Sequence, residues 1–391
     1  MMIITKILFW LSVVAIIHSY ILYPLILELL TFLRKDKIKI QYKENKKFPF
    51  VSILMSAYNE QEVLKIKVDS IFNTSYPLEK IEVLVGSDAS TDTTEKILNH
   101  LSTEYKKLQF FSFKKRQGKP NVINQLSDKA RGDILILTDA NVLFDKTTIP
   151  NLIKPFSNKD IGLVDARMIN KGMKKEGISK PEKFYISHEV NTKYKESILW
   201  GTMMGPFGGC YAVRKKLYSK VPDNYLVDDF YINMKVLEKG KKAINNLDAV
   251  VFEDVSNNLK DEFNRKVRIA TGNFQNLKQF KHLLSFETKT IAFSFFSHKV
   301  LRWFGPFFLL IAFFSNLFLF YSTFYLYLFY LQCFVIILPF IDFLMRKIKL
   351  HVILLRFITH FYSMNIALFI GFFKYLKGVK TNVWQPTKRN Q

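Results

Sequence analysis

The length of its uncharged apolar stretches is the feature that most constrains this chain. No residue from Ile7 to Leu27 carries a formal charge, and none does from Trp303 to Ile341. Since an α-helix rises about 1.5 Å per residue, roughly 20 apolar residues cross the hydrocarbon core of a bilayer. The first stretch therefore predicts one membrane-spanning helix, and the second predicts two, joined by a tight turn near Tyr321 to Thr323.

Basic residues beside the first stretch predict the orientation of the chain. Lys6 precedes it, and four basic residues follow it: Arg34, Lys35, Lys37 and Lys39. Because cytoplasmic flanks are enriched in Lys and Arg, residues 1–47 are expected to form an anchor and a basic linker that leave the next domain in the cytoplasm. A cleavable signal peptide is the alternative, but the apolar run is too long and no small-residue cleavage site follows it. We expect an integral protein of the plasma (inner) membrane.

Residues 290–391 are expected to lie in or on the membrane. The paired spans end at basic residues that mark a return to the cytoplasm: Arg346, Lys347 and Lys349. Phe357 to Phe373 is short and is followed by lysines that a full crossing would place outside, so it predicts a re-entrant or interfacial helix before a basic tail. Thr290 to Phe304 mixes aromatic and basic residues, which predicts an amphipathic helix at the membrane surface; an ordinary helix of the soluble domain is the alternative.

Composition limits the partners of the chain without choosing among them. Lys and Arg number 57 against 33 Asp and Glu, a net charge of +24 over 391 residues. Such a charge suits anionic lipid, a nucleotide phosphate or nucleic acid. The basic residues form no known recognition helix or RNP-type strand, so nucleic acid is not expected. Cys210 and Cys333 have no metal-ligand spacing and support neither a zinc site nor a disulfide framework.

Residues 48–289 alternate short apolar strands with helices that have one apolar face. The expected strands are Val51 to Leu54, Ile81 to Val85, Leu108 to Phe113 and Ile134 to Leu137. Helices are expected between them, the second of them capped by Ser90. This order predicts an α/β fold with a mostly parallel, doubly wound sheet. No Gly-x-Gly-x-x-Gly follows the first strand and no Gly-x-x-x-x-Gly-Lys-Ser/Thr occurs, which argues against dinucleotide and P-loop sites.

Two acidic segments follow strands of this predicted sheet. Gly86 to Asp92 comes after the second strand, and Thr138 to Asn141 comes after the fourth. Open α/β sheets bind ligands beyond the carboxyl ends of their strands. The simplest interpretation is a site for a nucleotide and a metal-bound phosphate.

Five segments in order carry a resemblance to a known family. They are Pro49 to Glu60, Ser87 to Asp92, Gly118-Lys119, Thr138 to Asn141 and Val227 to Asp229. The chain resembles the membrane-bound family 2 glycosyltransferases over roughly 240 residues and the flanking spans. The resemblance implies a GT-A fold and a hexosyltransferase that uses a nucleotide diphosphate sugar, usually with inversion at the anomeric carbon. Hyaluronan, cellulose and poly-N-acetylglucosamine synthases are relatives of this kind.

Residues beyond the first two strands and before the third helix are candidates for binding the donor. A uracil base needs stacking surface and polar edges, which Ala57, Tyr58 and Glu60 can supply. Asp88 can accept from the base or the ribose; taken alone, it would be a capping or turn residue. Lys119 can meet the diphosphate or the base edge, although by itself it would be a solvated lysine.

Asp139 and Asn141 are the candidate metal ligands. Mg²⁺ and Mn²⁺ prefer oxygen ligands, and either cation would stabilise the charge that develops on a departing diphosphate. Members of the family have Asp at the third position of this motif, where Asn141 offers only a carbonyl oxygen. The alternative is an Asx turn that closes the strand.

Asp229 is the candidate general base that takes the proton of the acceptor hydroxyl. Asp228 and Asp229 take the place of the family's acidic pair ahead of a helix, and adjacent carboxylates raise each other's pKa. Asp228 is expected to be a positioning residue or to cap the helix that follows it. Two acids that complement a helix dipole are the alternative.

Two further segments are expected to bind sugar or phosphate. Gly205 to Arg214 predicts a glycine-rich loop that lets the backbone approach a sugar, followed by a short strand. Arg268 lies where processive relatives carry Gln-x-x-Arg-Trp, and is a candidate phosphate ligand. The Gln and Trp of that motif are replaced by Arg265 and Ile269, so a basic amphipathic helix is the alternative.

These observations predict a membrane-bound, inverting, metal-dependent glycosyltransferase with a cytoplasmic catalytic domain at residues 48–289. Its expected partners are a nucleotide-sugar donor, a polysaccharide or lipid-linked acceptor, the bilayer and further copies of the chain. Transfer to polyprenyl phosphate, or a non-catalytic membrane scaffold or transporter component, are the alternatives.

Overall fold

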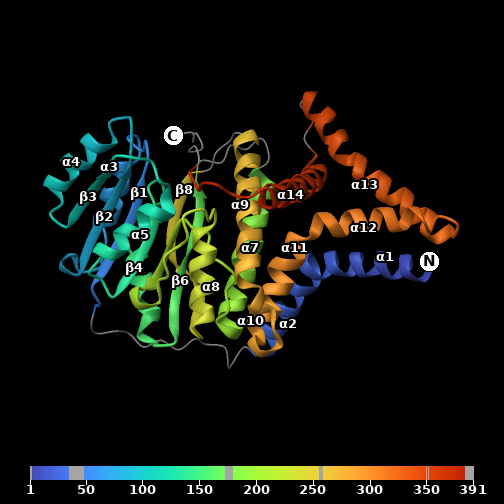
Figure 1. Ribbon diagram of the computed structural model, residues 1–391, viewed down its shortest axis with the longest axis horizontal. Helices are drawn as coiled ribbons and strands as arrows, with labels where there is room; N and C mark the ends of the chain where they lie inside the picture. Colours follow the sequence, from blue (N-terminus) through green and yellow to red (C-terminus); the bar gives the residue numbers. More distant parts are fainter. Residues whose placement is uncertain are drawn as a thin grey trace. The chain divides into compact units, whose positions relative to one another are not determined.

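The computed structural model describes residues 2–34, 48–171, 179–254, 259–348, 350 and 352–383 (Figure 1). The predictions about Lys35, Lys37, Lys39, Lys349 and the basic residues after 383 concern positions outside the described residues. The chain divides into two compact units. One takes in residues 31–173, 190–257 and 379–391, and contains the sheet. The other takes in residues 1–30, 174–189 and 258–378.

The first unit, which we call the sheet unit, is built on eight strands in the order β3-β2-β1-β4-β7-β6-β8-β5. The strands are β1 (Val51–Ala57), β2 (Ile81–Asp88), β3 (Leu108–Phe113), β4 (Ile134–Asp139), β5 (Leu143–Phe144), β6 (Ile161–Lys171), β7 (Cys210–Arg214) and β8 (Lys242–Asp254). The first four strands in this order are parallel, β7 is antiparallel to both of its neighbours, and β6 and β8 are parallel. The predicted α/β fold with a mostly parallel sheet is confirmed.

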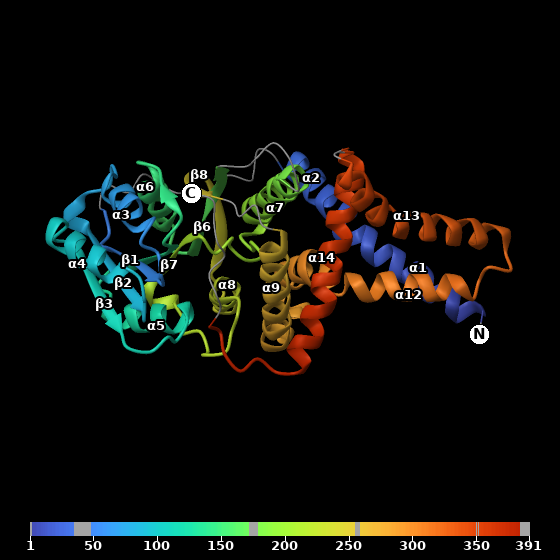
Figure 2. The same cartoon turned by 90° about the horizontal axis from the view of Figure 1, so that it is seen from above.

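Helices cover both faces of this sheet. They are α3 (Leu64–Phe72), α4 (Thr94–Glu104), α5 (Lys119–Lys129), α6 (Thr148–Ile153) and α8 (Asp228–Glu238), together with residues 190–200 of α7 (Ser179–Trp200). Val83 and Val85 share a core with α3, α4 and α6. Gly86 faces the other way, where a Cβ would lie only 2.3 Å from Cγ1 of Val122 on α5. Figure 2 shows α3 and α6 on one side of the sheet and α5 and α8 on the other, so the sheet is doubly wound.

The first four strands begin where the sequence predicts. The differences are at the carboxyl ends of three of these strands and at the start of one helix. β1, β2 and β4 run two or three residues farther than expected, which takes Asp88 and Asp139 into the strands. Ser90 does not cap α4, contrary to the prediction. The helix begins at Thr94, whose backbone N–H donates to Asp92 Oδ1 at 2.9 Å, while Ser90 Oγ accepts from the backbone of Asn59.

Strand register brings the carboxyl ends to one edge. Ser56 on β1 lies opposite Asp139 on β4, and Ala57 lies opposite Ser87 on β2. Because neighbouring strands are about 4.8 Å apart, the loops after β1, β2 and β4 are adjacent. The strand pairing therefore agrees with the prediction that these loops share one edge of the sheet.

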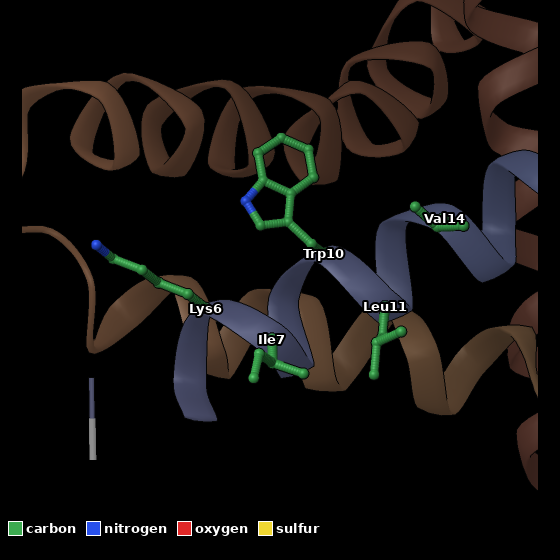
Figure 3. A pocket seen from close by; sticks show the side chains of 5 residues that line it. All are labelled: Lys6, Ile7, Trp10, Leu11 and Val14. Carbon is green, nitrogen blue, oxygen red and sulfur yellow. The ribbon is translucent and has the colours of Figure 1, made fainter. Parts of the chain in front are cut away.

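The second unit, which we call the helical unit, holds the long apolar helices. α1 (Met2–Ile17), a π-helical turn and α2 (Tyr23–Leu33) form one apolar helix of 32 residues, and α13 (Thr323–Lys347) and α14 (Ile353–Leu376) are also long and apolar enough to cross a membrane. Lys6, Ile7, Trp10, Leu11 and Val14 of α1 line a shallow pocket of about 330 Å³ (Figure 3). Its lining is apolar apart from the lysine, so it is suited to hydrocarbon contact.

The helix before α13 is shorter than the sequence predicts. α12 (Gly305–Leu317) has 13 residues, and it reaches spanning length only together with residues 290–303, from which it is bent by 62°. Pro306 at the start of α12 explains the break, since proline lacks the N–H that would continue the preceding helix. The turn before α13 covers residues 318–322, close to the position predicted from the sequence.

Residues 290–303 form a broken helix, with α10 (Thr290–Ser294), a π-helical segment (Phe295–Val300) and α11 (Leu301–Trp303). His298 and Arg302 on it are buried, and both meet Glu189 of α7. These basic groups thus pack inside the helical unit. For α14, the expected re-entrant or interfacial placement stays a prediction.

Candidate active site

The loops after β1 and β2 are joined by hydrogen bonds of the Asn59 side chain. Asn59 Oδ1 accepts from the Thr91 backbone N–H at 2.8 Å, and Asn59 Nδ2 donates to Thr91 Oγ1 at 3.2 Å. Asn59 and Ala89 have φ of 54° and 57°, a left-handed conformation that residues with a Cβ rarely adopt. Strained backbone of this kind clusters at ligand sites. The two loops form one rigid rim of the sheet.

Asp88 at the end of β2 holds the loop that precedes α5. Its Oδ1 accepts from the backbone N–H of Gln117 at 2.8 Å, and its Oδ2 accepts from that of Gly118 at 2.9 Å. The side chain is 2% exposed. The structure therefore gives Asp88 a positioning contact, whereas its predicted contact with a base or ribose stays a prediction.

Tyr58 forms a stacked pair with a residue that sequence reasoning missed. The Arg116 guanidinium lies 3.4 Å from the centroid of the Tyr58 ring. Both residues flank the rim, so the pair offers a planar surface for a base. Ala57 is fully buried in the core, and its predicted part in a base pocket stays a prediction. The Glu60 backbone N–H donates to Thr94 Oγ1 at 2.9 Å, which ties this loop to α4.

Lys119, the first residue of α5, connects two carboxylates from different elements. Its Nζ lies 2.5 Å from Asp139 Oδ1 at the end of β4 and 4.0 Å from Asp228 Oδ2 at the start of α8. Burial by itself would lower the pKa of Lys119, but Asp139, Asp228 and Asp229 raise it above its ordinary value. The ammonium group is therefore charged, and it neutralises part of this acidic cluster.

Asp229 lies against the glycine loop before β7. Its Oδ1 accepts from the Phe230 backbone N–H at 2.7 Å, and its Oδ2 lies so close to Gly208, at φ +83°, that a Cβ there would be 2.6 Å away. The next residue, Gly209, accepts from the backbone N–H of Asp139 at 3.0 Å. Asp139 and Asp229 thus flank the same two glycines. Burial and the charge of Asp228 raise the pKa of Asp229 to about 7.

Asn141 has a carboxylate neighbour that the sequence did not reveal. Its Nδ2 donates to Glu253 Oε1, near the end of β8, at 3.2 Å. Asp139, Asn141 and Glu253 together offer the carboxylate and carbonyl oxygens that hard divalent cations prefer. Among the described residues, no three His, Cys, Asp or Glu side chains converge on one point. A cation here would need further ligands from a bound molecule.

Two buried lysines contact residues that border the site. Lys67 on α3 donates to Thr138 Oγ1 at 2.9 Å and to the Val142 carbonyl, and burial lowers its pKa to about 7. Lys193 on α7 pairs with Asp165 at 2.8 Å and lies 3.5 Å from the ring centroid of Phe207 in the glycine loop. In the sequence, each resembles an ordinary lysine on the surface of a helix. The sequence therefore gives no reason to predict either of them near the site.

The remaining predicted residue belongs to the other unit. Arg268 lies on α9 (Leu259–Phe280), within the helical unit. Six other predicted residues share the rim or the acidic cluster of the sheet unit: Tyr58, Asp88, Lys119, Asp139, Asn141 and Asp229. The sheet unit thus places a charged lysine, the Asp139 carboxylate and a second carboxylate with a raised pKa around one pair of glycines.

Comparison with known protein families gives two matches that together run through most of the chain. The model described as "Glycosyl transferase family 2" matches residues 52–221, and the model described as "Glycosyl transferase family group 2" matches residues 181–369. The first covers the rim, Lys119, Asp139 and the glycine loop. The second covers Asp229 and most of the helical unit's C-terminal helices.

Individual relatives are more distant. Beta-monoglucosyldiacylglycerol synthase of Nostoc sp. is 33% identical over 121 residues, which is 30% of this chain and 26% of that protein. Probable glycosyltransferase YdaM of Bacillus subtilis is 24% identical over 66% of this chain and 63% of its own length. The chain thus spans less than two thirds of these relatives. The mannosyltransferase PcManGT of Pyrobaculum calidifontis, solved with GDP-Man and Mn²⁺, matches with a TM-score of 0.68 and 21% identity over 94% of this chain and 99% of that one.

Proposed function

We propose that this chain, which belongs to the family 2 glycosyltransferases and has their GT-A fold, transfers a hexose with inversion from a nucleoside diphosphate sugar to an acceptor hydroxyl. The observation that carries this proposal is the position of Asp229. Its carboxyl has a pKa of about 7 and lies across Gly208 and Gly209 from the Lys119–Asp139 pair. In this proposal, the proton acceptor and the diphosphate site lie on either side of one loop.

In this proposal Asp229 is the general base. As the acceptor oxygen bonds to the anomeric carbon, its proton moves to the Asp229 carboxylate, and the bond from that carbon to the diphosphate oxygen breaks on the opposite face. A base works best when its pKa lies near the working pH, because it is then both ionised and basic. The burial that raises the pKa of Asp229 supplies this match.

Lys119 and the rim are proposed to hold the donor. The Lys119 ammonium can exchange part of its contact with Asp139 for an oxygen of the diphosphate. Lys119 is the first residue of α5, and the N-terminus of a helix favours anions. Tyr58 and Arg116 provide the stacking surface for the base. Asp88 keeps the 117–118 amides in place for this binding.

A divalent cation, Mg²⁺ or Mn²⁺, fits the oxygen donors of Asp139, Asn141 and Glu253, which would hold it. When bound, it would offset the negative charge of the leaving diphosphate. Two carboxylates and one carbonyl leave positions that phosphate oxygens can fill. The mannosyltransferase of Pyrobaculum calidifontis was solved in complex with both a sugar nucleotide and Mn²⁺, which supports a divalent cation as the cofactor.

The acceptor is proposed to be a polysaccharide or a lipid-linked molecule at the membrane. Three helices of the described chain are long and apolar enough to cross a bilayer, and a bent pair is a fourth candidate. The name of the Nostoc relative, which describes a glucosylated diacylglycerol, supports a lipid acceptor. The helices would keep the sheet unit beside such an acceptor.

The test is a screen of UDP- and GDP-sugars for nucleotide release by the full chain in membranes with Mn²⁺. Lipid extract and oligosaccharide are supplied as separate acceptors. We expect one donor to give release, and both Asp139→Ala and Asp229→Asn to lose it by at least about a hundredfold. Release by both variants at the wild-type rate would overturn the site assignment.

A further inference from the structure

The segment after α14 returns to the sheet unit. Residues 379–383, which we call the tail, belong to that unit although they follow the last helix of the other one. The Val379 carbonyl accepts from Asn224 Nδ2 at 3.4 Å, and the Val383 backbone N–H donates to Thr381 Oγ1 at 3.1 Å. Asn382, at the centre of this turn, is 3% exposed. Asparagine outside a helix or strand is seldom buried to this degree.

Asn382 packs on Gly118, the residue between the rim and Lys119. A Cβ on Gly118 would lie 2.1 Å from Asn382 Oδ1 and 2.9 Å from its Cγ. Gly118 has φ +84°, so both its backbone conformation and the tail exclude a side chain there. The Gly118 N–H donates to Asp88 Oδ2, and the next residue, Lys119, pairs with Asp139. The tail therefore touches the loop that is proposed to bind the donor diphosphate.

The amide nitrogen of Asn382 is buried without an acceptor in the described part of the chain. Leaving such a donor unpaired is costly, and nearly all buried polar groups in folded proteins have a partner. Asp88 already accepts from the Gly118 N–H and Lys119 pairs with Asp139, so the Asn382 amide is the donor here that still needs an acceptor oxygen. A diphosphate beside Lys119 would supply one and would be favoured by the lysine charge.

We propose that Asn382 is a donor-binding residue: its Nδ2 donates to an oxygen of the nucleoside diphosphate, and the bound donor holds the tail against the Gly118 loop. This inference rests on the proposed function, since it assigns one more contact to the same site. It also makes residues 379–383 part of the proposed donor site.

The first test is nucleotide affinity, measured by calorimetry on the full chain in detergent with Mn²⁺ and with UDP or GDP. Asn382→Asp removes the donor group and adds a negative charge at nearly the same shape, so we expect binding to be at least about tenfold weaker. The matched control is Asn99→Asp on the exposed side of α4, for which we expect an unchanged nucleotide affinity. If the wild type binds neither nucleotide, the proposed function fails; if it binds one and Asn382→Asp binds it equally well, this inference fails.

A glycine pair tests the same contact without touching Asn382. Gly118→Ala would push the tail away, whereas Gly240→Ala introduces the same strain at φ +68° with nothing within 4 Å of the new Cβ. We expect weaker nucleotide binding only in the first variant. The accompanying readout is trypsin cleavage at the exposed Lys380 in the tail, which nucleotide should slow in the wild type and in Gly240→Ala but not in Gly118→Ala or Asn382→Asp. Equal protection in all four proteins would overturn the proposal.

Discussion

The burial of Asp229 that suits its carboxylate to accept a proton also makes the folded protein less stable. Its pKa rises from 3.8 to about 7 on folding. A carboxyl with a higher pKa in the folded chain makes folding less favourable as the pH rises between these two values. We therefore expect Asp229→Asn to abolish transfer and yet raise the melting temperature at pH 8, and to raise it less at pH 5. Thermal unfolding at both pH values measures this.

Asparagine keeps the shape of Asp229 and can still accept from the Phe230 N–H, so the comparison isolates the charge. A melting temperature below that of the wild type at pH 8 would show that the carboxylate is a structural group. Transfer that survives in the same variant would remove Asp229 as the base.

Asp228 is expected to set the pH at which Asp229 works. Its charge is the second cause, after burial, of the raised pKa of Asp229. In Asp228→Asn the acid limb of the pH–rate profile should therefore move below about 7, because Asp229 ionises more easily. The exposed Asp223→Asn is the control for the loss of one acid near this loop. An unmoved limb in Asp228→Asn would mean that the profile reports another group.

Glu253 is expected to contribute to cation affinity through its place beside Asn141. Glu253→Gln keeps a partner for the Asn141 amide but removes a carboxylate, so the Mn²⁺ concentration for half-maximal activity should rise about tenfold or more. Glu79→Gln, at an exposed position, should leave it unchanged. Activity titrations over Mn²⁺ concentration make the comparison, and equal half-maximal concentrations in all three proteins would exclude Glu253 from the site.

Which site residues the sequence could predict follows from how each is placed. Asp88 and Asp139 end strands, so the apolar pattern that predicts the strands also predicts them at one edge. Arg116 and Glu253 depend on the paths of loops and on pairing between distant segments: Glu253 meets a residue 112 positions earlier in the chain. No local pattern marks such a contact, and the raised pKa of Asp229 likewise depends on burial that only the fold creates.

At the scale of elements, the parallel half of the sheet was predictable, whereas in the other half only β7, the short strand after the glycine loop, was. β1 to β4 alternate with helices over short intervals, which gives a clear periodicity. β6 and β8, in contrast, pair in parallel with 70 residues between them and with two register shifts. Helices with buried polar faces, such as residues 290–303, also lack a simple apolar pattern because their charged groups are paired inside.

The helical unit depends on one such pairing, around Glu189 of α7. This carboxylate, 6% exposed, lies 2.5 Å from Lys299 Nζ, 2.9 Å from Arg302 Nη1 and 3.0 Å from His298 Nε2. Burial alone would raise the pKa of Glu189, but the three basic groups hold it well below its usual range. Glu189→Gln leaves buried cations uncompensated and should destabilise the protein by roughly 3–5 kcal/mol.

Thermal unfolding in detergent checks this, with Glu104→Gln at an exposed position on α4 as the control. Because the carboxylate is already ionised at low pH, the destabilisation should persist down to about pH 5. A Glu189→Gln protein as stable as the control would mean that the cations find other partners.

At the scale of the whole molecule, the position of the tail limits which of the apolar helices can cross a bilayer. The start of α1 lies beside the start of α13, since Trp10 Nε1 donates to the Tyr325 hydroxyl at 3.1 Å. If both helices cross a bilayer, we therefore expect them to begin on the same side of it. The sheet unit follows α2 and Lys347 ends α13, so both would then come to the other side.

Because the tail packs on Gly118, it must lie on the side of the sheet unit as well. The chain from Lys347 to Val379 then makes no net crossing, although α14 is long and apolar enough to span. We expect α14 to lie in the interface, where Gly371 packs against Ala270 of α9, as the lysines after it also predict. Reporters fused after residue 348 and after residue 383 should both report the cytoplasm, and one inserted in the 318–322 turn should report the outside. Opposite sides for 348 and 383 would require α14 to cross, and the tail could then not reach the donor site.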